Sequence, residues 1–415
     1  MLKNIYFSGN RFSLDIRGHV LKIVQINSVC VGSTGKICMG IRKVCKNQSN
    51  IDNRIIYFSG RNKKENIKLS NCIYQKYQAL KSRITGNYAF TATINSYRVI
   101  KYLKQNSPDI VHLHNIHDHS LNYEILFRYL GEHSINTVWT LHDCSAFTGY
   151  CMHFQIAKCD KWKTICEKCP QYKQFSWFFD KSTVLFNKKK ALTDNMQLTL
   201  VTPSYWLQNL VRASFLHEHD IYTINNGIDL SIFYPRASNF KENYNIKNKN
   251  MILGVAFDWG YKKGLDVFIE LSTILDSSFQ IVLVGTNDKI DRLLPRNIIS
   301  IHRTSNQSDL AEIYSAADVF VNPTREDTYP TVNMESIACG TPVVTFNTGG
   351  SPEMVDKECG IVVKDNLKDL FDAIKDIKNN KEEYQKSCLL QANKFDENVK
   401  YNQYVELYKY ILEKG

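Results

Sequence analysis

Two carboxylates and two lysines in the second half of the chain have the spacing of a site for a phosphorylated sugar. Asp327 lies in the polar loop 324–330, and Glu335 follows eight residues later, about a turn and a half into the next expected helix. Lys262 and Lys263 directly precede another expected helix, where cations oppose the helix dipole and are favoured beside a diphosphate. Acids beside phosphate are unfavourable unless they hold hydroxyl groups, so they indicate sugar or ribose recognition. The alternative is that Asp327 caps the helix and Glu335 lies on a solvated face.

Two histidines end strand-like segments in the first half of the chain. These segments, DIVHLH at 109–114 and TVWTLH at 137–142, are apolar enough to be buried strands. A histidine at such a strand end can take or share the proton of a hydroxyl group near neutral pH. A histidine satisfied by backbone groups in the core is the alternative. The polar residues at the two strand ends are His114, Asn115, His142 and Asp143.

Strand-like and helix-like segments alternate along the chain. This alternation predicts βαβ units, parallel sheets and the α/β class. In such sheets, ligands bind at the edge formed by the carboxyl ends of the strands. The strand candidates are residues 21–26, 54–58, 109–114, 137–142 and 198–202 in the first half, and 251–256, 281–285, 299–302, 319–321 and 343–346 in the second.

A glycine-containing loop follows the first strand candidate and leads into a helix. The Gly-Lys pair at Gly35 resembles part of a P-loop, but Cys30 stands five residues earlier and Ile37 replaces the metal-binding hydroxyl. A P-loop is therefore excluded. Gly32 and Gly35 either approach a ligand or only form a tight turn.

Several motifs occur together that resemble those of one family. Asp327-x7-Glu335 is followed by ACGTPVV and GGSPE, TLHDC-x-x-FTG contains His142, and NGID-x-x-x-F-x-P begins at Asn226. This set resembles the retaining family-4 glycosyltransferases, in particular enzymes of capsule, O-antigen and colanic-acid-type exopolysaccharide synthesis. The resemblance implies the GT-B fold, in which two Rossmann-like domains with parallel sheets face each other across a cleft. It also implies sugar transfer from a UDP- or GDP-linked donor to a glycan or polyprenyl-linked acceptor, with retention of configuration.

The resemblance implies roles for individual residues as well. Glu335 would bind the ribose of the donor, and Asp327 would hold the transferred sugar. Lys263 matches the phosphate-binding lysine of the family, whereas Asp258 stands where the family has an arginine. The candidates for supplying that missing charge are Lys262 and Arg303. The other donor-side residues are Gly32, Gly35, Glu326 and Thr328; the acceptor-side residues are His114, Asn115 and Asp143; the catalytic set is His142, Asp327 and Glu335.

The NGID motif and the polar residues 236–249 are expected to connect two domains. The expected divisions are an N-terminal extension over 1–20, an acceptor domain over 21–216 with a Cys-rich insertion at 144–180, a nucleotide-sugar domain over 217–396, and a C-terminal helix over 397–415 that packs back on the first domain.

Five cysteines cluster in the insertion, among the twelve of the whole chain. Cys166-x2-Cys169 is a zinc half-site by spacing, and Cys151 with Cys159 could complete a set of four thiolates. Free packed thiols and an oxidised pair are the alternatives. We expect a structural zinc at most, and no cofactor for catalysis.

The net charge of +11 suits a phosphorylated substrate or an anionic membrane surface. Lysines are scattered rather than striped, so we expect no nucleic-acid partner. The aromatic segment 175–179 and the lysine run 188–190 form either a peripheral contact with anionic lipid or a core helix with a solvated end. No apolar run approaches the length of a membrane span or a signal peptide, so we expect a cytoplasmic protein at the inner face of the membrane.

Two other functions share this architecture. A nucleotide-sugar 2-epimerase would release free nucleotide or the epimer without an acceptor. A non-catalytic glycan-binding homologue is the other alternative, although a binding module would not need both the acids and the lysines.

Overall fold

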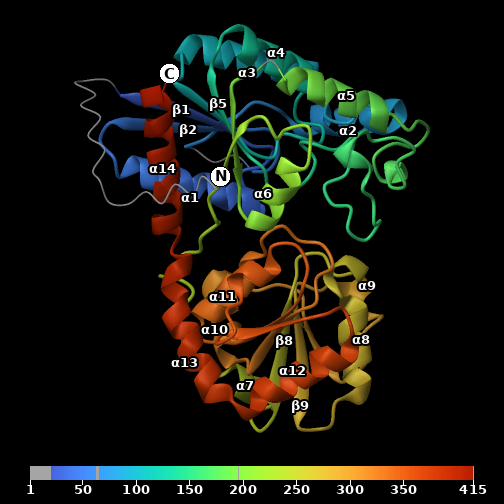
Figure 1. The fold of residues 1–415 in the computed structure, drawn as a ribbon. Coiled ribbons are helices and arrows are strands. Elements are labelled where there is room, and N and C mark those ends of the chain that lie inside the picture. Colours follow the sequence, from blue (N-terminus) through green and yellow to red (C-terminus); the bar gives the residue numbers. More distant parts are fainter. Residues whose placement is uncertain (1–19, 62–64, 195, 415) are drawn as a thin grey trace.

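The computed structural model describes residues 20–61, 65–194 and 196–414. It contains two α/β domains, the first above the second in Figure 1. The predicted extension over residues 1–20 lies outside the described residues except for Val20.

The first domain is built on a parallel sheet in the order β3-β2-β1-β4-β5-β6-β7. The order reverses between β1 and β4, so the loops after these two strands diverge at the carboxyl edge of the sheet and leave a crevice there. The strands are β1 (Leu21–Ile26), β2 (Ile51–Tyr57), β3 (Ile67–Lys68), β4 (Ile110–Leu113), β5 (Asn136–Thr140), β6 (Leu198–Thr202) and β7 (Asp220–Thr223).

The second domain repeats the arrangement with the order β10-β9-β8-β11-β12-β13, again all parallel. Its switch point lies between β8 and β11. The strands are β8 (Asn250–Val255), β9 (Phe279–Val284), β10 (Ile298–Ile301), β11 (Val319–Asn322), β12 (Val343–Phe346) and β13 (Gly360–Val363). The predicted α/β class with two parallel sheets is confirmed.

Helices cover the sheets of both domains (Figure 1). In the first domain they are α1 (Gly32–Lys46), α2 (Cys72–Thr85), α3 (Thr93–Asn106), α4 (Tyr123–Glu132), α5 (Ser182–Thr193) and α6 (Tyr205–Arg212). In the second they are α7 (Phe240–Asn243), α8 (Leu265–Ile274), α9 (Asp288–Asp291), α10 (Gln307–Ala316), α11 (Thr331–Ala338), α12 (Leu367–Asn379) and α13 (Lys381–Ala392), followed by α14 (Glu397–Lys414).

Helix α14 packs against α1 of the first domain, far from it in sequence. Gly40 makes this possible, because a Cβ atom there would lie 2.2 Å from the ring of Tyr401. Two tyrosines of α14 also reach polar groups under the sheet: Tyr408 lies 2.6 Å from Nδ1 of His112, and the hydroxyl of Thr140 donates to Tyr404. The C-terminal helix is thus part of the core of the first domain.

Strand β7 belongs to the first sheet, where it pairs with β6. We expected the second domain to begin at residue 217, which places this strand on the wrong side of the boundary. Its residues are only partly buried and begin with an aspartate, so the segment lacks the apolar run that marked the other strands.

Candidate functional site

A turn with two lysines lies beside the loop after β11. Residues Tyr261–Lys263 form a 3₁₀ turn, and Gly264 follows with φ of 70° before α8 begins. A Cβ atom on Gly264 would lie 2.5 Å from the carbonyl oxygen of Pro323, so only glycine lets the two segments approach this closely. The backbone N–H of Arg325 donates to the carbonyl of Lys262 at 2.9 Å. The lysine turn is therefore held against the carboxylate loop, residues 323–330.

Both lysines of this turn face acids of the carboxylate loop. Nζ of Lys263 lies 2.6 Å from Oδ2 of Asp327, and Nζ of Lys262 lies 3.6 Å from Oε2 of Glu326. Burial would raise the pKa of Asp327, but the charge of Lys263 outweighs burial and lowers this pKa. Burial lowers the pKa of Lys262 despite Glu326. Two lysines and two carboxylates therefore share one rim of the second domain.

The neighbouring acids Glu326 and Asp327 have different surroundings. Oε1 of Glu326 accepts the backbone N–H of Ile156, in the insertion of the first domain, at 3.0 Å. Asp327 packs against Gly349, which has φ of 59° and whose Cβ would lie 1.7 Å from the Asp327 carbonyl oxygen. Glu326 thus connects the two domains, which leaves Asp327 as the better placed of the two acids for a ligand.

Arg325 supports the lysine turn and was not among the predicted site residues. Its guanidinium binds both oxygens of Asp266 at 2.8 and 2.9 Å and also contacts Asp365. It lies 4.0 Å from the ring centroid of Tyr261 and donates to the carbonyl of that residue. Its place within the charged loop was visible in the sequence, but its partners come from separate segments.

Glu335 is a buried carboxylate on α11, and its environment favours a ligand. The hydroxyl of Tyr314 donates to its Oε2 at 3.2 Å. Burial raises the pKa of Glu335, whereas the charge of Lys36 from the first domain acts in the opposite direction. Thr328, in the carboxylate loop, has a buried hydroxyl without a hydrogen-bond partner among the described residues. A bound polyol could satisfy both groups.

The two glycines of the first loop differ in what surrounds them. Gly32 has φ of 74° and open space where its Cβ would lie. A Cβ on Gly35 would lie 2.6 Å from the carbonyl carbon of Cys30, so this glycine is needed to close the turn. Helix α1 begins at Gly32, so both glycines lie in its first turn rather than in the loop before it. Gly32 alone therefore offers free space to a ligand.

A chain of hydrogen bonds determines the tautomer of His142. Nε2 of Gln25 donates to the carbonyl of Cys38 and to Oδ1 of Asn53, so Oε1 of Gln25 faces His114. His114 then donates from Nε2 to Gln25 at 2.9 Å, and its Nδ1 accepts from Nε2 of His142 at 3.2 Å. Nδ1 of His142 keeps its lone pair. Burial lowers the pKa of His142 to about 4, so the ring is a neutral hydrogen-bond acceptor at pH 7.

His117, which we did not predict from the sequence, forms an ion pair next to this chain of hydrogen bonds. Its Nε2 donates to Asp143 at 2.9 Å, and its Nδ1 lies 3.2 Å from Asp118. Burial disfavours the charged ring, but the two carboxylates outweigh burial and raise the pKa of His117 to about 10. Asp143 also accepts the N–H of Ser145, so both its oxygens are occupied. Asp143 therefore positions the strand end beside His142. The backbone N–H of Asn115 likewise donates to Oδ1 of Asn27.

Replacing His117 by glutamine is expected to destabilise the protein by about 3 kcal/mol, because buried Asp143 loses its cation. The folded pKa lies above the unfolded value of about 6.5, so this stabilisation is complete below pH 6.5 and is lost as pH rises towards 10. Urea unfolding of both proteins should show a difference that shrinks between pH 7 and 10. Asp118→Asn is the milder control, since Asp118 is half exposed. A pH-independent difference would contradict the ion pair.

His153 is a second histidine that the sequence reasoning did not assign to the site. It lies in the insertion, and its Nδ1 is buried without a partner among the described residues. Burial lowers its pKa, and its ring lies near enough to Lys262, Asp327 and Glu326 to interact with their charges. The insertion thus places a polar ring beside the carboxylate loop.

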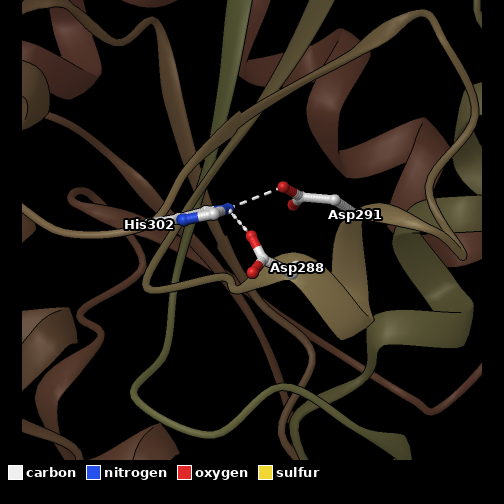
Figure 2. Close-up of side chains that lie close together, drawn as sticks. All are labelled: Asp288, Asp291 and His302. Atoms are coloured by element: carbon white, nitrogen blue, oxygen red, sulfur yellow. Dashed lines mark hydrogen bonds and ion pairs between the residues drawn. The ribbon is translucent and has the colours of Figure 1, made fainter.

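The end of β10 carries exposed polar residues. Figure 2 shows one ring nitrogen of His302 facing both Asp288 and Asp291, with Nε2 at 2.6 Å from Asp291 and 3.9 Å from Asp288. These three side chains are the one group in residues 20–61, 65–194 and 196–414 whose ligand atoms gather as a metal site would. All three are exposed, and the ion pair explains their approach without a metal. Arg303, the predicted donor-side cation, is the exposed residue that follows.

The four predicted zinc ligands surround one small pocket. Cys151, Cys159, Cys166 and Cys169 all line it. The sulfurs of Cys151 and Cys169 are 3.7 Å apart, close to the roughly 3.8 Å between two ligands of a tetrahedral zinc with Zn–S bonds of about 2.3 Å. No three of these sulfurs gather as closely as the ligands of a formed metal site would. Zinc binding by this cluster stays a prediction.

Protein purified without a metal-binding tag is expected to contain about one zinc per chain if the four thiols bind the ion. Cys166→Ser should then lose the zinc and lower the unfolding temperature. Cys72→Ser is the matched control, because Cys72 is exposed on α2, away from the pocket. Elemental analysis of the wild type that detects no zinc would exclude the site.

Two family models match successive parts of the chain. The model described as Glycosyltransferase Family 4 matches residues 84–232, and the model described as Glycosyl transferases group 1 matches residues 249–380. A glycosyltransferase family-4 model thus covers most of the first domain, and a glycosyl transferase group-1 model covers most of the second. The chain is 24% identical over 269 residues to the putative colanic acid biosynthesis glycosyl transferase WcaC of Escherichia coli, over 62% of this chain and 64% of that one.

A second relative is the N,N'-diacetylbacillosaminyl-diphospho-undecaprenol alpha-1,3-N-acetylgalactosaminyltransferase of Campylobacter jejuni. It is 27% identical over 213 residues, which cover 48% of this chain and 56% of that one. The chain thus spans about three fifths of the length of these curated relatives.

Solved structures share the whole fold of this chain. Sucrose-phosphate synthase from Thermosynechococcus elongatus aligns with a TM-score of 0.71 and 16% identity over 95% of this chain and 100% of that one. The Anabaena protein HepE in complex with UDP aligns with a TM-score of 0.67 and 12% identity over 94% and 100%. The predicted GT-B fold is confirmed. No helix in the described ranges is long and apolar enough to span a bilayer.

Proposed function

We propose that the protein transfers a sugar from a nucleoside diphosphate donor to a hydroxyl group of a glycan or polyprenyl-linked acceptor in the synthesis of a bacterial surface polysaccharide. The matches to the two glycosyltransferase models support the transfer reaction. The E. coli relative is named for colanic acid biosynthesis and the C. jejuni relative for a diphospho-undecaprenol substrate, which supports this acceptor class. The HepE neighbour holds UDP or UDP-glucose, which favours UDP as the donor nucleotide over GDP.

The observation that carries the proposal is the lysine turn held against the carboxylate loop. A diphosphate beside Lys262 and Lys263 would be stabilised by two cations, and by the N-terminal amides of α11. Next to the diphosphate, Asp327 and Thr328 would bind the hydroxyl groups of the sugar, and Glu335 would bind the ribose. His142 would face the acceptor from the first domain.

In the proposed reaction the bond between the anomeric carbon and the diphosphate oxygen breaks. The lysines stabilise the negative charge that develops on the leaving group, so these residues can supply the electrostatic help without a cofactor. The acceptor oxygen forms the new bond on the same face, and Nδ1 of His142 accepts or shares the hydroxyl proton. Retention by this front-face route is what the family implies.

A panel of UDP- and GDP-sugars tests the proposal. The correct donor should raise the unfolding temperature, and with a polyprenyl-linked acceptor it should yield nucleoside diphosphate and a glycoside whose anomeric configuration NMR reports. Release of an epimer without acceptor would instead show a 2-epimerase. Binding of glycans without turnover of any donor would show a non-catalytic protein.

Glu335→Gln is expected to weaken donor binding about tenfold to a hundredfold, because a charged hydrogen-bond acceptor contributes about 1.5 to 3 kcal/mol. Titration of the donor by the shift in unfolding temperature measures the loss. Tyr314→Phe should have a smaller effect, since it removes only the hydroxyl that orients Glu335. Unchanged donor affinity in Glu335→Gln would remove this residue from the site.

A further inference from the structure

Helix α2 has apolar side chains on its solvent side and polar ones on its buried side. Its buried residues are Gln78 and Ser82. Spacings of four, three and four residues place its exposed apolar residues in one stripe, on the side opposite to this buried pair. The stripe consists of Ile73 (82% exposed), Tyr77 (56%), Leu80 (49%) and Ile84 (42%). A helix that only covers a domain would show the reverse pattern.

An aromatic loop continues the stripe at the end of α2. The backbone N–H of Trp177 donates to the carbonyl of Arg83 at 2.8 Å. The carbonyl oxygen of Phe179 would lie 3.0 Å from a Cβ on Gly86, the residue that ends the helix. Trp177, Phe178 and Phe179 are each more than half exposed. We call the stripe of α2 together with these three side chains the apolar face.

The start of α3 adjoins the other end of the apolar face. The N–H of Ile94 donates to the hydroxyl of Tyr74 at 3.2 Å, and Ile94 and Tyr97 are themselves exposed. In Figure 1, α2 lies on the side of the first domain away from α14. The face therefore belongs to the first domain and is separate from the helix that closes its core.

The charge on the segment that carries α2 and α3 is entirely positive. Residues 66–108, which contain α2 and α3, include no aspartate or glutamate. On the α2 helix, Lys76 and Arg83 flank one side of the stripe and Lys81 flanks the other. The basic residues of the segment are Lys68, Lys76, Lys81, Arg83, Arg98, Lys101 and Lys104. Asp180 follows the aromatic loop, and its two oxygens accept the backbone N–H groups of Cys169 and Ser182.

This combination fits a lipid surface better than a protein partner. Centres of protein interfaces are depleted in lysine. Helices that lie in a membrane interface instead combine tryptophan, phenylalanine and leucine on one face with lysine and arginine beside it, whose long side chains reach the headgroups. The absence of acids from residues 66–108 removes the repulsion that anionic headgroups would otherwise meet along the α2 stripe.

We propose that the apolar face docks the first domain on the surface of an anionic lipid bilayer, with the α2 stripe and the aromatic loop inserted among the headgroups. Docking would bring the first domain to the surface at which a polyprenyl-linked acceptor is presented. This link between docking and sugar transfer rests on the proposed function. Lipid binding itself requires only the face.

The lysine run 188–190, expected beside the aromatic segment as a lipid contact, contributes little to this face. Lys189 is buried, and its ammonium group donates to the carbonyls of Ser145 and Thr148 at 2.7 and 3.0 Å. Lys188 pairs with Glu124 of α4. The cations that accompany the aromatic loop are those of α2.

Vesicle flotation of the full-length protein tests the docking. Vesicles of phosphatidylcholine with phosphatidylglycerol should carry the protein, vesicles of phosphatidylcholine alone should not, and added salt should weaken binding. The double variant Lys76→Glu/Lys81→Glu is expected to lower the vesicle affinity about tenfold or more. Leu80→Ser with Phe178→Ser should lower it similarly through the apolar part.

Leu390→Ser with Lys386→Glu is the matched control, because both residues lie exposed on α13 of the second domain. Retained binding in this control and loss in the face variants supports the proposal. Equal loss in both sets, or no flotation of the wild type with anionic vesicles, overturns it. Dimerisation of the wild type that the face variants abolish would also overturn it, in favour of a second copy of this chain.

The same variants separate docking from catalysis. Because their sites lie outside the donor site, they should keep the rise in unfolding temperature caused by the donor sugar in solution without vesicles. A wild type that floats but binds no nucleotide sugar would remove the proposed function and leave the docking intact.

Discussion

Lys263→Met is expected to lower kcat/KM for sugar transfer by about a hundredfold to a thousandfold. The expectation follows from the cost of removing one preorganised charge that stabilises a leaving group, about 2.7 to 4 kcal/mol. Nζ of Lys263 is held 2.6 Å from Oδ2 of Asp327 in the carboxylate loop. The assay is release of nucleoside diphosphate with the natural donor, at saturating and at limiting acceptor.

The loss of an ion pair in Lys263→Met could by itself disturb the fold, so a matched variant is needed. Lys241→Met serves this purpose. The partner of Lys241 is Asp318, which directly precedes strand β11, whereas Asp327 follows the other end of that strand. That variant should lower the unfolding midpoint and leave kcat/KM per folded molecule unchanged. If both variants lost activity to the same degree, the effect of Lys263 would be one of stability, and it would not bind the diphosphate.

The strands at 21–26 and 198–202 were predicted to the residue because they are mostly apolar runs of five or six residues, as is typical of buried parallel strands. Strands β3 and β7 have no such run. Lys68 in β3 and Asp220 in β7 interrupt an already short segment, so the pairing with a neighbouring strand decides their structure. The N-cap of α10 is Asn306, whose side chain accepts the backbone N–H of Asp309.

The positions of the candidate site residues could be predicted where the residue follows a strand along the chain. Asp327, Glu335 and Lys263 belong to this class, and the contact between Lys263 and Asp327 joins two of them, whereas their roles stay predictions. Gln25 and His117 do not belong to this class, because their importance depends on which side chains meet them in space. Gln25 in particular reads as one polar residue in an apolar strand, and only its contact with His114 connects it to the site.

The burial of Lys189 could not be predicted either. Three consecutive lysines indicate a solvated surface in any composition-based interpretation. Helical geometry turns the middle one inward, where three backbone carbonyls of the insertion accept its protons. The insertion has little regular secondary structure, so no periodic pattern in the sequence predicts where those carbonyl groups lie.

His142→Ala is expected to reduce kcat by about a hundredfold to ten-thousandfold, the range for loss of a positioned proton acceptor. Only the neutral ring can accept a proton in the proposed reaction, and burial lowers the pKa of His142 to about 4. The wild-type kcat/KM should therefore stay level as pH falls from 7 and decline only near pH 4, because activity is lost when the ring gains a proton. Rate measurements from pH 4 to 8 on folded protein test this.

Gln25→Glu tests the hydrogen-bonded chain that orients this ring. A carboxylate beside His114 would stabilise a proton on the two coupled rings, so the acidic decline of kcat/KM should move to higher pH. Tyr408→Phe is the matched control, since it removes the hydrogen bond of neighbouring His112 and leaves the chain intact. It should lower stability without moving the pH profile. An unchanged profile in Gln25→Glu would mean that His142 acts without the chain, and a loss of activity in His142→Ala would then reflect only its contact with the acceptor.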